Sequence, residues 1–178
     1  MAKTKWVLDP THSEVTFKIK HLMITNVSGQ FNKFEANVET EGEDFMTASA
    51  NFSADIDSIT TNNEQRDGHL KAADFFDAAK FPKLKFVATK YENVDNDGSY
   101  ELYGDLSIKD VTKNVKLDVE FGGVIKDPWG NTRAGLTISG KINRKDFGLH
   151  WNAATEAGGL VLGEEVKIHV SVEFTKLP

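Results

Sequence analysis

Four residues near the start of the chain have the side chains that hydrolases use: Asp9, His12, Ser13 and His21. A Ser-His-Asp triad needs three side chains that converge on one reacting atom, and Asp9, His12 and Ser13 are too close in sequence for that. His12 and His21 are nine residues apart, so on an unbroken strand they point to opposite faces. We therefore expect His12 to tie down the entry to the first strand by a hydrogen bond. His21 should face inward, either as a satisfied core histidine or as a polar contact to a ligand head group.

A second candidate group combines His69 with Asp67 and Asp74. Side chains on a helix meet at spacings of three or four, and neither pair has such a spacing. We expect His69 to be solvated or to cap a helix. No metal site or catalytic residue is predicted from this group.

Two glycine-containing motifs are also rejected. The segment from Asn93 through Asp95 and Asp97 resembles the start of a calcium loop, but the position of the bidentate glutamate is taken by Gly104. The glycines of 158–163 lack the Lys-Ser/Thr pair of a phosphate-binding loop. No metal and no cofactor is therefore expected.

The composition narrows the class of protein. The chain has 178 residues, which suits one domain over 1–178, and its net charge of −6 argues against a nucleic-acid surface. It contains no cysteine, so disulfides and thiolate chemistry are excluded. No stretch reaches the ~20 apolar residues of a membrane helix. With no signal segment in the sequence as written, we expect a cytoplasmic protein, or a periplasmic or secreted one if the chain is a processed form.

Alternation of apolar and polar residues dominates the chain and predicts β-strands. Eight such segments occur, near residues 14–20, 28–40, 48–56, 84–93, 100–109, 115–121, 134–142 and 166–174. Mostly short turns such as Asp97-Gly98 join them, which favours pairing between sequence neighbours. Residues 62–82 instead contain helix formers and end at Pro82, and a brief turn or helix is expected over 144–149. The prediction is an all-β, eight-stranded antiparallel up-and-down barrel with a short helical insert between strands 3 and 4.

The inward faces of these strands carry many small residues, which bears on what the barrel holds. They are Ala36, Ala48, Ala50, Ala54, Ala88, Gly104, Ala134 and Gly140. Small residues either fit the tapered end of a filled barrel or leave an apolar cavity. A dry apolar cavity binds a hydrocarbon chain readily, because water makes no useful bonds with its walls.

Taken together, the sequence resembles the YceI-like, polyisoprenoid-binding, lipocalin-like family over nearly its whole length. The matching pieces are Trp6-x-x-Asp9-x-x-His12-Ser13-x-x-x-Phe17 with His21, Gly29-x-Phe31, Arg66-x-x-His69-Leu70, Asp74-Phe75-Phe76-Asp77, Phe81-Pro82, Gly104-x-Leu106-x-Ile108-x-x-Val111-Thr112, Asn143-Arg144-x-x-Phe147-Gly148 and Gly163-x-Glu165-Val166. The resemblance implies an elongated apolar pocket for a polyprenyl chain, an isoprenoid quinone or a fatty-acid-like molecule.

The leading hypothesis is a non-enzymatic protein that binds a long-chain isoprenoid or similar amphiphilic lipid for transport, storage or sequestration. The expected ligand-binding residues are Phe17, Ile19, His21, Phe34, Phe86, Leu102, Leu106, Leu136, Ile138, Val170 and Phe174. Two alternatives stay open: an isomerase or hydrolase that uses His21 on a similar amphiphile, and a filled barrel whose insert is a partner surface. A homodimer is also left open, since no segment of the sequence indicates an interface.

Overall fold

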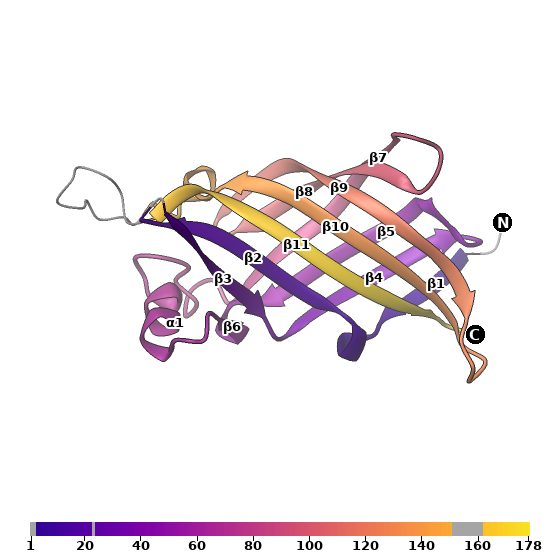
Figure 1. The fold of residues 1–178 in the computed structure, drawn as a ribbon, viewed down its shortest axis with the longest axis horizontal. Coiled ribbons are helices and arrows are strands. Elements are labelled where there is room, and N and C mark those ends of the chain that lie inside the picture. Colours follow the sequence, from indigo (N-terminus) through magenta and orange to yellow (C-terminus); the bar gives the residue numbers. More distant parts are fainter. Residues whose placement is uncertain (1–2, 23, 151–161) are drawn as a thin grey trace.

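The computed structural model describes residues 3–22, 24–150 and 162–178, and shows a barrel of β-strands with one short α-helix (Figure 1). The strands are β1 (Lys3–Leu8), β2 (Glu14–His21), β3 (Thr25–Phe31), β4 (Phe34–Glu41), β5 (Asp44–Asp55), β6 (Ile59–Thr60), β7 (Lys83–Asn93), β8 (Ser99–Ile108), β9 (Val111–Lys126), β10 (Thr132–Asn143) and β11 (Leu162–Lys176). The helix α1 is Glu64–Lys71, and the 3-10 turns are η1 (Pro10–His12), η2 (Ile56–Ser58) and η3 (Arg144–Phe147).

The strands close into a ring in the order β1-β4-β5-β7-β8-β9-β10-β11, with β11 pairing back to β1. β2 pairs with the first part of β11, β3 pairs with β2, and β6 pairs with β3. Three positions of the wall are therefore each shared by two consecutive strands: β1 with β2, β3 with β4, and β5 with β6. Together with β7 to β11, they make a ring of eight positions. All pairings are antiparallel, and they join consecutive positions of the wall, apart from those of β11 with β1 and β2, which close the ring. The predicted eight-stranded up-and-down barrel is therefore confirmed.

The interruptions within the shared wall positions have local causes. Proline at position 10 has no N–H for a sheet ladder, and the Asp9 side chain accepts a hydrogen bond from the Thr11 N–H at 3.0 Å. The first wall position is therefore two strands, β1 and β2, joined by η1. The first strand expected from the sequence is near residues 14–20, so β1 was not predicted; Trp6 lies within it and is 2% exposed.

The helical insert lies where the ladder of strands is incomplete. β6 pairs only with β3, and β7 pairs with β5 and β8, so within the described residues no ladder joins β6 to β7. The insert (residues 62–82) connects these two strands and contains α1, as predicted from the sequence. Its Phe75 and Ala78 are buried among the barrel's apolar side chains. The insert thus covers one end of the barrel, which we call the insert end.

The opposite end holds the first and last described residues, and we call it the terminal end. Figure 1 shows both labelled chain ends there, with the turn between β4 and β5 and the loop between β9 and β10. None of the described helices is long and apolar enough to cross a membrane.

Candidate ligand-binding cavity

A cavity of about 680 Å³ occupies the interior of the barrel. The side chains that line it come from β2 through β11, apart from β6, and from the insert, and they reach from Phe45 and Phe174 near the terminal end to His69 at the insert end. Along the strands the lining residues alternate, as in Phe17, Ile19 and His21 of β2, because successive side chains of a strand face opposite sides. The lining is almost wholly apolar through the middle of the barrel. Such a volume and lining suit a long hydrocarbon chain.

The expected wall residues lie in this lining with one exception. Phe17, Ile19, His21, Phe86, Leu102, Leu106, Leu136, Ile138, Val170 and Phe174 all line the cavity. Phe34 is the exception: its ring lies 6.1 Å from that of Phe52 and packs against the apolar clusters of the wall instead. Phe34 follows the break between β3 and β4, and alternation that is counted across such a break does not predict which way a side chain points. Ligand contact stays a prediction for every one of these residues.

Small residues create the cavity only at some of the expected positions. Ala36, Ala48 and Ala50 line it, as their alternation predicts. The two inward glycines differ, because a Cβ at Gly104 would collide with the Phe86 ring, and one at Gly140 with Leu117. Neighbouring side chains already occupy the room that these glycines leave. The interpretation of Gly104 and Gly140 as sources of empty space is therefore wrong.

The terminal end of the cavity is sealed by aromatic packing. Phe45 lies 4.9 Å from Trp6 and 5.1 Å from Phe121, measured between ring centroids. The Trp6 indole N–H donates to Thr40 Oγ1 at 2.9 Å, so the polar atom of this buried ring is satisfied. Nearby, the Tyr91 hydroxyl donates to the Ala48 carbonyl at 3.0 Å, and burial raises the pKa of Tyr91 to about 12. Tyr91 is therefore neutral at physiological pH and contributes no charge to the cavity.

Polar side chains line the insert end of the cavity. His21 was expected there, but six others were not predicted as site residues. They are Thr61, Asn63, Gln65, Arg66, His69 and Arg144. Arg66, His69 and Arg144 are part of the motifs that carry the family resemblance. The alternation of apolar and polar residues around them gave no reason to place them at one site. The incomplete ladder between β6 and β7 brings the insert against the barrel mouth, and no local pattern predicts that long-range placement.

Arg144 is a buried cation in this lining, with 1% of its surface exposed. Its Nε donates to the Gly163 carbonyl at 2.8 Å, and its Nη1 donates to the Leu149 carbonyl at 2.7 Å. Burial lowers the pKa of Arg144, although an arginine so far from neutrality keeps its charge. These contacts hold the guanidinium group at the cavity wall.

His69 is held by a carboxylate, contrary to the expectation from its spacing. Its Nε2 lies 3.0 Å from Asp74 Oδ2, and its ring centroid lies 6.0 Å from that of Phe75. Because the helix ends at Lys71, the chain folds back and brings Asp74 to His69. In a longer helix, the spacing of five residues would keep these two side chains apart. Asp67 instead accepts hydrogen bonds from the N–H and hydroxyl of Thr61, at 2.8 and 2.6 Å.

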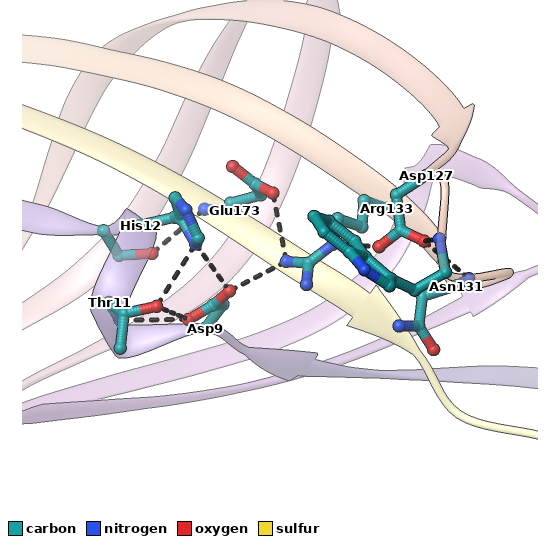
Figure 2. A network of polar contacts seen from close by, with 9 residues as sticks. Asp9, Thr11, His12, Asp127, Asn131, Arg133 and Glu173 are labelled. Atoms are coloured by element: carbon teal, nitrogen blue, oxygen red, sulfur yellow. Dashed lines mark hydrogen bonds and ion pairs between the residues drawn. The ribbon is translucent and has the colours of Figure 1, made fainter.

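The residues near the start of the chain that could have formed a hydrolase site make an ion-pair network outside the cavity (Figure 2). Asp9 Oδ2 lies 2.9 Å from His12 Nδ1 and 2.8 Å from Arg133 Nη1, which also lies 3.1 Å from Glu173 Oε1. Hydrogen bonds from Thr11, Arg133 and His12 hold the pKa of Asp9 well below its usual range.

This network fastens strands together rather than assembling a nucleophile. The Ser13 hydroxyl accepts a hydrogen bond from the backbone N–H of Glu173 at 3.0 Å. Asp9, His12 and Glu173 could reach one cation, but the Arg133 guanidinium already lies against both carboxylates. The predicted hydrogen bond that ties His12 at the entry to the strand is confirmed.

Comparison with known proteins adds independent information. The model of the YceI-like domain matches residues 6–174. A UPF0312 protein of Staphylococcus aureus strain MSSA476 is 40% identical over 173 residues, which cover 97% of this chain and 98% of that protein. The crystal structure of the Campylobacter jejuni YCEI protein has a TM-score of 0.77 and 34% identity, and the match covers 90% of this chain and 91% of that one.

More distant structures share the fold alone. Burkholderia cenocepacia BcnA has a TM-score of 0.80 at 21% identity, over 93% of this chain and 98% of that one. A polyisoprenoid-binding domain from Saccharophagus degradans has a TM-score of 0.65 at 14% identity, over 96% of this chain and 97% of that one. The barrel is thus maintained across widely different sequences.

Proposed function

Since the chain belongs to the YceI-like family and encloses an apolar cavity, we propose that it binds a long-chain amphiphile inside the barrel. The ligand would be a polyisoprenoid, an isoprenoid quinone or a fatty-acid-like lipid, bound for transport, storage or sequestration. The observation that carries the proposal is the cavity itself, about 680 Å³ in volume and lined by apolar side chains from nearly every strand. The shared fold with a polyisoprenoid-binding domain supports the same ligand class.

The size of the cavity sets the expected length of the buried chain. A methylene group is similar in size to a water molecule, which occupies ~30 Å³ in the liquid, so the cavity holds roughly twenty such groups. Burial at ~0.8 kcal/mol per methylene then contributes roughly 16 kcal/mol before the cost of association, about 4 to 15 kcal/mol. Apolar burial alone is therefore sufficient for binding. A polyprenyl chain longer than about twenty carbons would project from the mouth.

The direct test is to identify what the native protein carries. Protein purified without detergent is extracted with organic solvent, and the extract is analysed by mass spectrometry beside that of a Leu136→Trp variant. Leu136 lines the cavity, and an indole at this position would occupy the ligand's space. We expect an amphiphile in the wild-type extract at near-stoichiometric amounts and little in the variant. A wild-type extract without lipid, together with no uptake of cis-parinaric acid by the purified protein, would refute the proposal.

A catalytic role on the same ligand class would require an acid or base inside the cavity, and His21 lines it. A His21→Ala variant separates the two functions. A binding protein keeps its ligand with at most a modest loss of affinity. Turnover of the extracted lipid by the wild type, lost in His21→Ala while binding is retained, would replace the binding role by an enzymatic one.

A further inference from the structure

A second, smaller pocket lies at the terminal end of the barrel, beside the main cavity. Its volume is about 180 Å³, and its walls are residues around the start of β5, residues around the turn between β7 and β8, and Phe121 of β9. None of the residues that we expect to bind the ligand lines this second pocket.

The second pocket lies where two neighbouring strands of the wall separate. The ladder between β5 and β7 ends, toward the terminal end, at the pair of Asn51 and Val87. Within the described strands, residues 44–50 of β5 therefore have no ladder partner on β7. The Tyr91 hydroxyl of β7 reaches across and donates to the Ala48 carbonyl of β5 at 3.0 Å. Side chains, rather than a ladder, close the wall at this place.

Two of these side chains, Phe45 and Tyr100, line both the main cavity and the second pocket and so separate them. Tyr100 belongs to continuous ladders, because it pairs with Val119 of β9 and with Asn93 of β7. Phe45 instead lies on the part of β5 that has no partner on β7. Its ring is therefore the group whose removal would join the two spaces.

The Phe45 ring is held firmly in this position. It is 5% exposed, and its centroid lies 4.9 to 6.4 Å from those of three neighbouring rings, Trp6, Phe121 and Phe174. The backbone on both sides of it is fixed, since the Glu41 N–H donates to Thr47 Oγ1 at 2.8 Å and the Thr47 hydroxyl donates to the Asp44 carbonyl at 2.6 Å. A ring packed in this way resists displacement by a hydrocarbon tail, which would have to break these contacts.

We propose that Phe45 determines the length of the chain that the barrel holds. The tail of the ligand points from the insert end toward the terminal end, and the Phe45 ring stops it after about twenty carbons, the number that the main cavity accommodates. The second pocket lies beyond this stop. The proposal rests on the proposed function and adds a residue that sets the specificity for chain length.

The test is a competition between chains of different length. Delipidated full-length protein is mixed with phosphatidylcholine vesicles that contain saturated fatty acids of 14 to 26 carbons, or polyprenols of three to seven isoprene units. The protein is then separated from the vesicles, and mass spectrometry gives the ratio of bound to vesicle-held ligand for each length. Because vesicle and cavity are both apolar, this ratio should change little while the chain fits. Beyond about twenty carbons it should fall roughly fourfold for each methylene left in water.

Phe45→Ala should move this limit outward. At ~30 Å³ for each methylene, the second pocket holds roughly six more carbons, so the ratio for the acid of 26 carbons should rise at least about a hundredfold over that of the wild type. Phe31→Ala is the matched control, because Phe31 is 7% exposed and lines the main cavity but not the second pocket. Its limit should stay within about two carbons of the wild-type limit, because the room it frees lies beside the chain rather than beyond its end.

The pair Phe45→Leu and Phe31→Leu repeats the comparison with a smaller loss of packing, and circular dichroism checks the fold of all four variants. The limit should again move further in the variant of Phe45. Equal limits in the variants of Phe45 and Phe31 would overturn the role of Phe45, because total volume would then set the length. A wild-type ratio that does not fall with length would overturn it as well, and both outcomes leave the proposed function intact. Absence of every acid and polyprenol from the wild-type protein would overturn both proposals.

Discussion

The two ends of the barrel are closed by different means. At the terminal end, aromatic side chains pack together, and the Phe45 ring centroid lies 4.9 Å from that of Trp6 and 5.1 Å from that of Phe121. At the insert end, the ladder is incomplete between β6 and β7, and the insert with its polar side chains covers the opening. On the proposed function, we therefore expect the terminal end to contribute stability and the insert end to admit the ligand. Substitutions at the two ends should separate these properties.

The largest effect is expected from Trp6→Ala at the terminal end. Trp6 is 2% exposed, so its removal leaves a cavity and takes away the hydrogen bond that Thr40 Oγ1 accepts, and should lower the free energy of unfolding by about 3 to 5 kcal/mol. Urea denaturation measures the change. Trp129→Ala is the control, since Trp129 is 81% exposed and should cost less than about 0.5 kcal/mol. Equal stability of the two variants would contradict the sealing role of Trp6.

A large effect on binding, with a smaller one on stability, is expected from Leu136→Trp. The indole takes the room of about three or four methylene groups of ligand, worth ~3 kcal/mol, so affinity should fall roughly a hundredfold. Titration with cis-parinaric acid measures it. Val87→Trp is the matched control, because Val87 is 51% exposed and does not line the cavity. Unchanged affinity in Leu136→Trp would show that the ligand lies elsewhere.

Substitution of two glycines, one in the wall and one in the insert, should change the stability by smaller amounts. Gly104→Ala should destabilise the protein by about 1 to 3 kcal/mol, because the added Cβ meets the Phe86 ring and the Val87 carbonyl of the neighbouring strand. Gly68→Ala in α1 meets nothing within 4 Å and should stabilise the helix by about 0.5 to 1 kcal/mol. Thermal unfolding measures the first change, and slowed amide exchange over 64–71 measures the second. The same sign for both variants would contradict this difference between wall and insert.

The smallest effect concerns the Asp9 network, and it depends on pH. The folded state lowers the pKa of Asp9 below its ordinary value of 3.8, so the carboxylate stabilises the fold at pH values above that value. The contribution is lost as pH falls below about 4 toward the lowered folded pKa. Asp9→Asn should therefore cost about 1 kcal/mol at pH 7 and clearly less at pH 3. Denaturation of both proteins at the two pH values is the measurement, and a cost that is independent of pH would contradict the charged role.

The barrel could be predicted from sequence because its signals are local. Alternation in β8 and β10, the turn at Gly98 with a φ of 92°, and the helix formers of the insert each depend on a few consecutive residues. Closure followed from the short connections between neighbouring strands. The strand β1 was not predicted because η1 interrupts the first wall position, and β1 is too short for alternation to be decisive.

The site was predictable only where its residues share a strand face. The apolar wall follows from alternation, whereas Phe34 departs from it after a break between strands. The pairing of His69 with Asp74 depends on where α1 ends, and the placement of Arg66 and Arg144 depends on the position of the insert against the mouth. Such long-range juxtaposition is set by tertiary packing, which residue spacing does not encode directly.

The pairing that closes the ring has a consequence for biosynthesis. Trp6, Val7 and Leu8 pair with Lys176, Thr175 and Phe174, so residues from opposite ends of the chain form one ladder. A ribosome must release almost the entire chain before this ladder can form, and until then β1 and β10 have unpaired edges. The nascent barrel therefore stays an open sheet with unpaired edges during synthesis. Loss of only the last few residues of β11 would leave the edge of β1 unpaired in the finished chain, while β2 stays paired with the rest of β11.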